Sequence, residues 1–145
     1  MSMLMNIPRD FTPALLRLMM ELGHGEELLI CDANFPYLSV SCQKKDLVHI
    51  TGCPIPQLLE EVLRFFPLDQ SVESAAMVME SAKEGDTFDT YQRVLQGSPT
   101  TTVLDAVPRF DFYSRANNAI GVVVTSDTSK GGNILLKKGV VREYA

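Results

Sequence analysis

Apolar residues along the chain follow two spacings, one typical of helices and one typical of strands. After Thr12 and Pro13, a hydroxyl N-cap and a proline at the first helical position, leucines and methionines recur every three or four residues as far as Leu22. Gly23 ends this pattern. The segment 28–31 is then apolar at every position, which is typical of a strand buried on both faces. The sequence therefore predicts a helix that ends at Gly23, followed by a buried strand.

The same alternation continues along the rest of the chain. Helices are predicted from about 54–56 to 66, from 87 to 95 and from 110 to 119, and strands over 75–79, 103–107, 120–125 and 133–136. Helices that alternate with apolar strands indicate an α/β fold. We expect a single-domain α/β/α sandwich over residues 1–145, built around a mainly parallel sheet. Ligands of such sheets bind beyond the carboxyl ends of the strands.

Composition and charge exclude several classes of function. The chain is 46% hydrophobic over 145 residues, enough for a sizeable core, and its formal net charge is −5. Basic residues are scattered apart from Lys44-Lys45 and Lys137-Lys138, which we interpret as solvated turn charges, so nucleic-acid binding is not expected. The sequence shows neither a signal-peptide pattern nor an apolar run of membrane-spanning length. We therefore expect a cytoplasmic protein without a membrane partner.

The standard motifs for metals, phosphates and nucleophiles are missing. Three cysteines at positions 31, 42 and 53 are odd in number and lack CxxC spacing, and the two histidines lie far apart in sequence, so no metal site is expected. The sequence contains neither a P-loop nor a dinucleotide fingerprint nor a Gly-x-Ser-x-Gly elbow. His49 lies in an apolar stretch and is interpreted as structural.

The triplet Gly23-His24-Gly25 is the most distinctive stretch for chemistry. A histidine between two glycines has little cover from neighbouring side chains, and it can give and take protons near neutral pH. Asp32, Arg109 and Asn133 also fall at predicted loop positions. Together these groups suit the hydroxyls of a neutral carbohydrate. A helix C-cap followed by a surface histidine is the alternative interpretation of the triplet.

Further blocks of sequence occur in a fixed order from near the N-terminus to near the C-terminus. They are Glu21–Glu26, Asp32–Pro36, Phe66–Asp69, Glu84–Thr87, Arg109–Ala116 and Gly132–Val140. Taken together, these blocks resemble the fucose mutarotase and ribose pyranase family, and within it the L-fucose mutarotase branch.

The resemblance implies the family's α/β fold, no metal or organic cofactor and a place in cytoplasmic sugar metabolism. It implies interconversion of the α and β anomers of a free monosaccharide by ring opening and closure, with L-fucose the leading substrate. It further implies that His24 transfers protons, that Asp32 and Arg109 bind the sugar, and that Gly131-Gly132-Asn133 completes the site. Finally, it implies a ring-like homo-oligomer, commonly a decamer, whose sites are shared between subunits.

The chain departs from the family at Gly131, where relatives usually carry tyrosine. Tyr37, Tyr113 and Tyr144 are candidates for replacing that ring from elsewhere. If the tyrosine is simply missing, Gly131→Tyr should tighten sugar binding and speed anomer exchange, and we favour this expectation. If Gly131 adopts a positive φ, the same substitution should strain the loop. Two other functions stay open: a non-catalytic sugar-binding or scaffolding protein, and a ribose-type pyranase.

Overall fold

The computed structural model describes residues 3–40 and 46–142, which form an α/β fold around one mixed sheet. The sheet has the strand order β2-β5-β1-β6-β3-β4. Its strands are β1 (Glu27–Cys31), β2 (Asp46–Ile50), β3 (Ala76–Met79), β4 (Leu104–Val107), β5 (Gly121–Thr125) and β6 (Ile134–Lys137). Only β6 among these runs antiparallel to its neighbours, β1 and β3. The predicted fold class, with its mainly parallel sheet, is confirmed.

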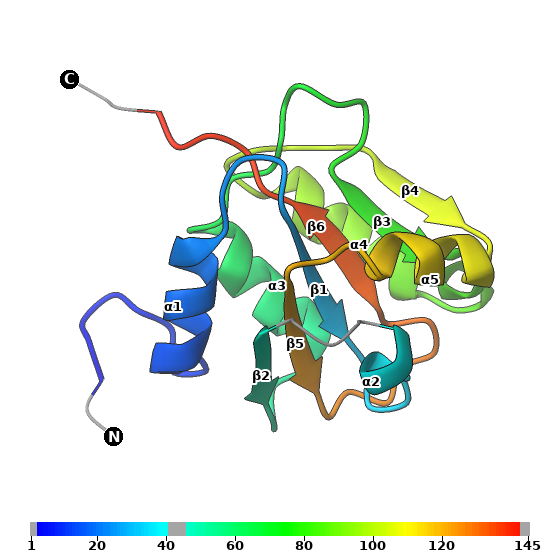
Figure 1. The fold of residues 1–145 in the computed structure, drawn as a ribbon, viewed down its shortest axis with the longest axis horizontal. Coiled ribbons are helices and arrows are strands. Elements are labelled where there is room, and N and C mark those ends of the chain that lie inside the picture. Colours follow the sequence, from blue (N-terminus) through cyan, green and yellow to red (C-terminus); the bar gives the residue numbers. More distant parts are fainter. Residues whose placement is uncertain (1–2, 41–45, 143–145) are drawn as a thin grey trace.

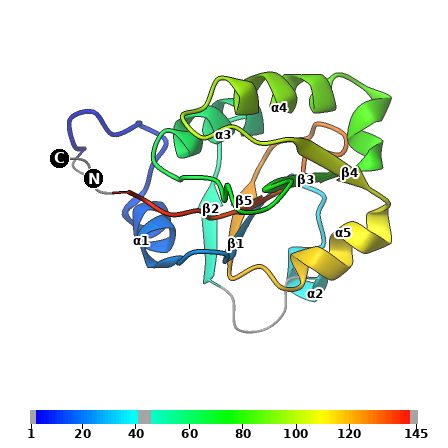
Figure 2. The same cartoon turned by 90° about the horizontal axis from the view of Figure 1, so that it is seen from above.

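Helices cover both faces of this sheet, which gives three layers (Figures 1 and 2). On one face lie α1 (Pro13–Glu21), α3 (Ile55–Leu63) and α4 (Thr87–Gln96). On the other face lie α2 (Tyr37–Val40) and α5 (Arg109–Ala116), and a short 3-10 helix, η1 (Glu80–Glu84), follows β3. In the described part of the chain, no helix has both the length and the apolar character needed to cross a membrane.

The packing of strand β1 explains why residues 28–31 are all apolar instead of alternating with polar ones. Leu28 and Ile30 point into the larger core beneath α1, α3 and α4, whereas Leu29 and Cys31 point into the smaller core beneath α2 and α5. Successive side chains of a strand face opposite sides, so a strand covered on both faces is apolar at every position. The central strand β5, which pairs with β1 in parallel, is buried along its whole length in the same way.

The main differences from the prediction lie in short elements at the margins. Strand β2 at the edge of the sheet was not predicted, and only Val48 and Ile50 of its residues are buried. His49 is exposed on this strand, with its ring centroid 6.2 Å from that of Tyr37. Helix α2 spans four residues, too few to show a helical period in the sequence. The predicted helix over 54–66 ends at Leu63.

Lys138 corrects the interpretation of the C-terminal lysine pair. Its Nζ donates to the backbone oxygens of Met19 and Leu22, at 2.7 and 2.5 Å, where the carbonyls at the end of α1 lack helical partners. Burial lowers the pKa of this amine. Lys138 is therefore a helix-capping residue rather than a solvated turn charge. The other pair, Lys44-Lys45, lies outside the described residues.

Candidate functional site

The candidate site residues lie at two opposite edges of the sheet. Asp32 follows β1, Arg109 follows β4 and Asn133 precedes the antiparallel β6, so all three belong to the edge where the parallel strands end, here called the carboxyl edge. His24 precedes β1 and lies at the other edge, the amino edge. The five residues of β1 alone extend about 13 Å. Within one chain, the depth of the sheet therefore separates His24 from Asp32.

At the carboxyl edge, Asp32 and Asn133 hold each other in place. The side-chain Oδ1 of Asn133 accepts a hydrogen bond from the backbone N–H of Asp32 at 2.7 Å. The Asp32 carboxylate accepts one from the backbone N–H of Asn34 at 2.9 Å. Asp32 is 6% exposed and Asn133 3% exposed. Burial raises the pKa of the Asp32 carboxyl, while the N–H groups of Asn34 and Gly132 oppose that rise.

Gly131 lies beside this pair in a backbone conformation that residues with a side chain rarely adopt. Its φ is +64°, in the left-handed region. A Cβ added there would lie 2.6 Å from the backbone nitrogen of Ala82 and 2.8 Å from Oγ of Ser81, both in η1. The backbone of η1 thus occupies the space that a side chain would need. The positive φ and these contacts support the alternative expectation, that Gly131→Tyr strains the loop.

A buried tyrosine on α4, Tyr91, holds the backbone of Gly131-Gly132 in place. The hydroxyl of Tyr91, on α4, donates to the backbone oxygen of Gly132 at 2.6 Å. Tyr91 is fully buried, and burial raises the pKa of its phenol. Its ring therefore shapes the loop instead of facing a ligand. The rings of Tyr37 and Tyr113 pack against other aromatic residues, and Tyr144 lies outside the described residues.

Arg109 shares the carboxyl edge but stands apart from Asp32. Three strand spacings, about 14 Å, separate β4 from β1 in the sheet. The Arg109 side chain is exposed, and its guanidinium carbon lies 4.8 Å from the ring centroid of Phe110. The structure therefore brings Asp32, Gly132 and Asn133 together but leaves Arg109 at the far side of the same edge.

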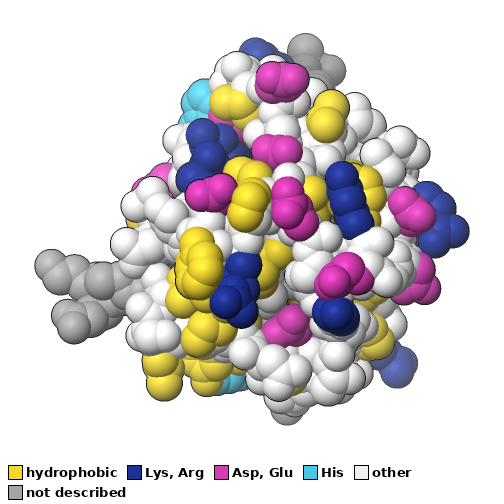
Figure 3. Space-filling view, turned by 90° about the vertical axis from the view of Figure 1, so that its right-hand side faces the viewer, with side chains coloured by type: hydrophobic (Ala, Val, Ile, Leu, Met, Phe, Trp, Pro, Cys, Tyr) yellow, Lys and Arg dark blue, Asp and Glu magenta, His cyan; other side chains and the backbone are white. Residues whose placement is uncertain are grey.

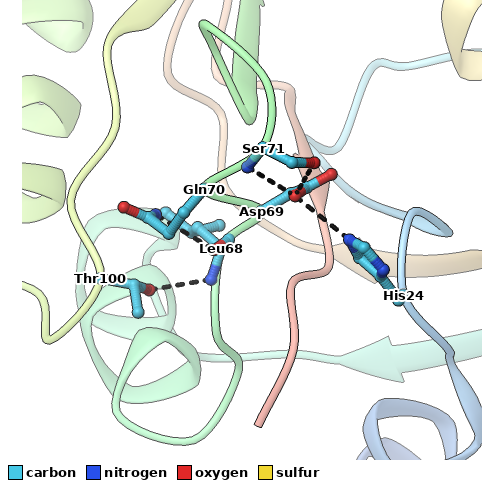
Figure 4. A network of polar contacts seen from close by, with 6 residues as sticks. All are labelled: His24, Leu68, Asp69, Gln70, Ser71 and Thr100. Atoms are coloured by element: carbon cyan, nitrogen blue, oxygen red, sulfur yellow. Dashed lines mark hydrogen bonds and ion pairs between the residues drawn. The ribbon is translucent and has the colours of Figure 1, made fainter. Parts of the chain in front are cut away.

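At the amino edge, His24 lines a small cavity of about 330 Å³ together with Leu68, Asp69, Gln70, Ser71, Thr100, Val140 and Arg142. Figure 4 shows the imidazole of His24 next to Asp69. His24 Nε2 lies 3.3 Å from Asp69 Oδ1, and the side chains are 52% and 6% exposed respectively. The same Oδ1 accepts hydrogen bonds from the Ser71 hydroxyl at 2.7 Å and from the Ser71 N–H at 3.0 Å. The cavity volume of about 330 Å³ is at the lower end of the range for small-molecule sites.

The environment of Asp69 keeps its carboxyl group ionised at neutral pH. The hydrogen bond from the Ser71 hydroxyl lowers its pKa most, the Ser71 N–H adds to this, and His24 contributes further. Burial acts in the opposite direction but is outweighed. His24 thus has a permanent anionic neighbour.

This lowered pKa leads to a prediction about acid stability. Because the unfolded chain binds a proton at Asp69 more readily than the folded chain does, ionised Asp69 stabilises the fold above its usual pKa of 3.8. That contribution is lost as the pH falls through the lower folded pKa. We expect the difference in unfolding free energy between the parent and Asp69→Asn to shrink as the pH is lowered below 3.8, as measured by urea denaturation. A difference that stayed constant with pH would contradict this.

One cluster of side chains in the described chain brings together atoms that could ligate a metal ion. Ligand atoms of Asp10, Cys53 and Glu61 lie within 4.8 Å of one another. The amide of Gln57 donates to both carboxylates, at 3.1 and 3.2 Å. Burial, followed by the hydrogen bond with Asp10, raises the pKa of the Cys53 thiol to about 12. The thiol is therefore protonated at neutral pH.

A second cavity lies over strands β3, β4 and β6, away from the predicted site residues. Its volume is about 430 Å³, larger than the cavity at His24. Glu27, Arg115 and Lys137 are among its lining residues, and Arg115 forms an ion pair with Glu27 at 3.0 Å. The sequence blocks that suggested a sugar site do not assign a role to these three residues.

Comparison with known proteins gives consistent results over nearly the whole chain. The sequence pattern of the RbsD / FucU transport protein family matches residues 5–141. The fucose mutarotase of Homo sapiens is 40% identical over 149 residues, covering 97% of this chain and 96% of that protein. The structure of the fucose mutarotase from Streptococcus pneumoniae in complex with L-fucose aligns with a TM-score of 0.86 and 36% identity, covering 96% of this chain and 100% of that one.

A more distant structure shares the fold alone. Bacillus subtilis RbsD complexed with D-ribose aligns with a TM-score of 0.74 at 13% identity, covering 90% of this chain and 95% of that one. The resemblance noted in the sequence blocks is thus confirmed by matches that extend well beyond them. The chain belongs to the RbsD / FucU family.

Proposed function

We propose that this protein is a fucose mutarotase, an isomerase that interconverts the α and β anomers of L-fucose. The observation that carries this proposal is the nearly full-length similarity to fucose mutarotases, including one whose structure contains L-fucose. The local chemistry agrees, since a half-exposed histidine lines a cavity of suitable size beside a buried carboxylate. Cytoplasmic sugar metabolism is the setting that we propose for this activity.

Mutarotation moves one proton from the anomeric hydroxyl to the ring oxygen. The bond between C1 and the ring oxygen breaks as the C1 carbonyl forms, the carbonyl rotates, and closure on its other face gives the second anomer. We assign this proton transfer to His24, because its side chain is accessible. Asp32, Arg109 and the Gly131–Asn133 segment bind the sugar hydroxyls and keep the substrate oriented in this proposal.

The two edges of the sheet support a site shared between two copies of the chain. Since His24 lies at the amino edge and Asp32 at the carboxyl edge, one sugar can meet both only when the amino edge of one copy faces the carboxyl edge of another. Repetition of such a head-to-tail contact closes a ring when the rotation from one copy to the next divides a full turn evenly. We propose a homo-oligomeric ring, with a decamer as the expected assembly.

Exposed apolar side chains are consistent with such contacts. Figure 3 shows the face that carries β4 and α5, where hydrophobic side chains gather next to charged ones. Large hydrophobic residues that are exposed in the single chain include Met20, Leu38, Val103, Phe110 and Val141. Where exposed apolar side chains gather into a patch, the patch often marks an interaction site.

Exchange NMR on free sugars tests the proposed activity directly. We expect the protein to transfer magnetisation between the anomeric protons of L-fucose at rates well above those of buffer. Faster exchange of D-ribose than of L-fucose would instead identify a ribose-type pyranase. Saturable L-fucose binding without accelerated exchange would identify a non-catalytic sugar-binding or scaffolding protein.

A further inference from the structure

We propose that Asp69 is the positioning residue for His24: its Oδ1 accepts the Nε2–H of the imidazole, so that Nδ1 is the nitrogen that exchanges protons with the sugar. This inference rests on the proposed mutarotase function and adds a residue to it. Asp69 lies in the Phe66–Asp69 block that resembles the family, but that resemblance implies no role for it.

The direction of the contact follows from the chemistry of the two groups. An ionised carboxylate can only accept hydrogen bonds, so at 3.3 Å the Nε2 of His24 must be the donor to Asp69. A neutral imidazole carries one ring proton, and placing it on Nε2 leaves the lone pair on Nδ1. Nδ1 is then the ring nitrogen able to take the proton of an anomeric hydroxyl.

Asp69 is itself fixed before any sugar binds. Both hydrogen bonds from Ser71 converge on the Oδ1 atom that faces His24, and the side chain of Asp69 is 6% exposed (Figure 4). A carboxylate held in this way loses little conformational entropy when it orients the imidazole. Its negative charge also lies 3.3 Å from Nε2 of the ring that carries positive charge after His24 has taken a proton and before it returns one to the ring oxygen.

The backbone brings the two partners together across 45 residues of sequence. The N–H of Gly25, next to His24, donates to the carbonyl of Lys138 at 2.8 Å. On the other side of the same segment, the N–H of Asp69 donates to the carbonyl of Lys137 at 3.0 Å. Residues 137–139 therefore form a common support, to which the histidine loop and the aspartate segment are both paired.

Gly139 makes the close approach of these segments possible. Its N–H donates to the carbonyl of Pro67 at 2.7 Å. A Cβ at this position would lie 2.5 Å from the backbone oxygen of Leu68 and 3.0 Å from the Cα of Asp69. Any larger residue would push the aspartate segment away from residues 137–139 and hence from His24.

Two substitutions separate the hydrogen bond from the charge. Asp69→Asn retains an Oδ1 that can accept from His24 and Ser71 but removes the negative charge, whereas Asp69→Ala removes the acceptor itself. For each variant, exchange NMR at several L-fucose concentrations gives kcat and KM, and 15N spectra of labelled histidine report which ring nitrogen carries the proton. His49 serves as an internal reference, because it lies on the outermost strand β2 and not in the loop that carries His24.

We expect kcat to fall about tenfold to a hundredfold in Asp69→Ala, since a hydrogen bond to a charged group is lost, with KM changed far less. The His24 spectrum should shift from the Nε2–H tautomer toward a mixture in Asp69→Ala and keep that tautomer in Asp69→Asn, which should still lose kcat. Asp89→Asn, which removes the same charge from an exposed position of α4, should match the parent throughout.

An unchanged tautomer or an unchanged kcat in a folded Asp69→Ala variant would overturn the assignment. If Asp69→Ala does not fold, Asp69→Asn still tests it, because parent-like kcat in that variant would also overturn it. The tautomer spectra do not depend on turnover, so they separate this proposal from the proposed function. If the parent protein carries the Nε2 proton but does not accelerate L-fucose exchange, the mutarotase function is rejected and the hydrogen bond between His24 and Asp69 still stands.

Discussion

Replacing His24 with alanine should remove most of the acceleration of L-fucose anomer exchange. A positioned acid–base group typically contributes about 10²–10⁴-fold to a rate, and no other histidine lies at the amino edge in the described chain. The fold should be retained, because the His24 side chain is 52% exposed and Asp69, its hydrogen-bond partner, keeps both bonds from Ser71. Exchange NMR and thermal unfolding of the variant measure the two effects separately.

His49→Ala is the matched control for this experiment. It also removes an exposed histidine, but this histidine lies on the outermost strand β2, whereas His24 lies in the loop before β1. Exchange in His49→Ala should equal that of the parent. Parent-like exchange in a folded His24→Ala variant would contradict the role of His24, and an equal loss in both variants would point to a general effect on the protein.

Gly131→Tyr should destabilise the protein and slow exchange. An L-residue at φ +64° costs about 1–3 kcal/mol, and the Cβ contact of 2.6 Å with the Ala82 nitrogen adds to that cost because backbone has to move. The shift would reach Gly132, whose carbonyl Tyr91 holds, and then Asp32, which lies against Gly132. Urea denaturation measures the loss of unfolding free energy, and exchange NMR measures the loss of rate.

Two alanine variants show whether the conformation is the cause. Gly131→Ala adds only the Cβ and should already account for most of the destabilisation. Gly97→Ala adds a Cβ whose nearest contact, Arg93 O at 3.6 Å, is ordinary van der Waals contact, so it should change stability far less. Tighter L-fucose binding by Gly131→Tyr at parent stability would show instead that the site merely lacks a tyrosine.

Local signals in the sequence predicted the elements well where the physical cause was local. Thr12 caps α1 by accepting a hydrogen bond from the N–H of Leu15 at 3.1 Å, as the hydroxyl followed by Pro13 indicated. The apolar run of β1 correctly indicated a strand covered on both faces, and β5 was correctly predicted as a strand. Strand β2 was not predicted, because an edge strand with exposed positions lacks a continuous apolar run.

The architecture of the site depends on contacts that no local pattern records. The hydrogen bond between Asp32 and Asn133 joins residues 101 positions apart, and the contact between His24 and Asp69 joins residues 45 positions apart. The sequence placed His24 before the predicted strand over 28–31 and Asp32 directly after it, so the two were already expected at opposite ends of that strand. It gave no sign that Asp69 lies beside His24 or that Asn133 lies beside Asp32.

Mixed assemblies of two impaired variants test most directly whether sites are shared between copies. His24→Ala impairs the amino edge, and Asp32→Asn weakens sugar binding at the carboxyl edge by removing charge-assisted hydrogen bonds worth about 1.5–3 kcal/mol each. The two chains, carrying different tags, are co-expressed and purified through both tags. L-fucose exchange is then compared with that of each variant alone.

In a shared site, a copy with intact His24 can face a copy with intact Asp32. Random mixing should restore about a quarter of the sites, because each site needs the right variant on both sides of one contact. We expect the mixed assembly to exchange L-fucose anomers at about that fraction of the parent rate. Exchange no faster than the average of the two separate variants, or failure of the two chains to assemble, would contradict a site built from two copies.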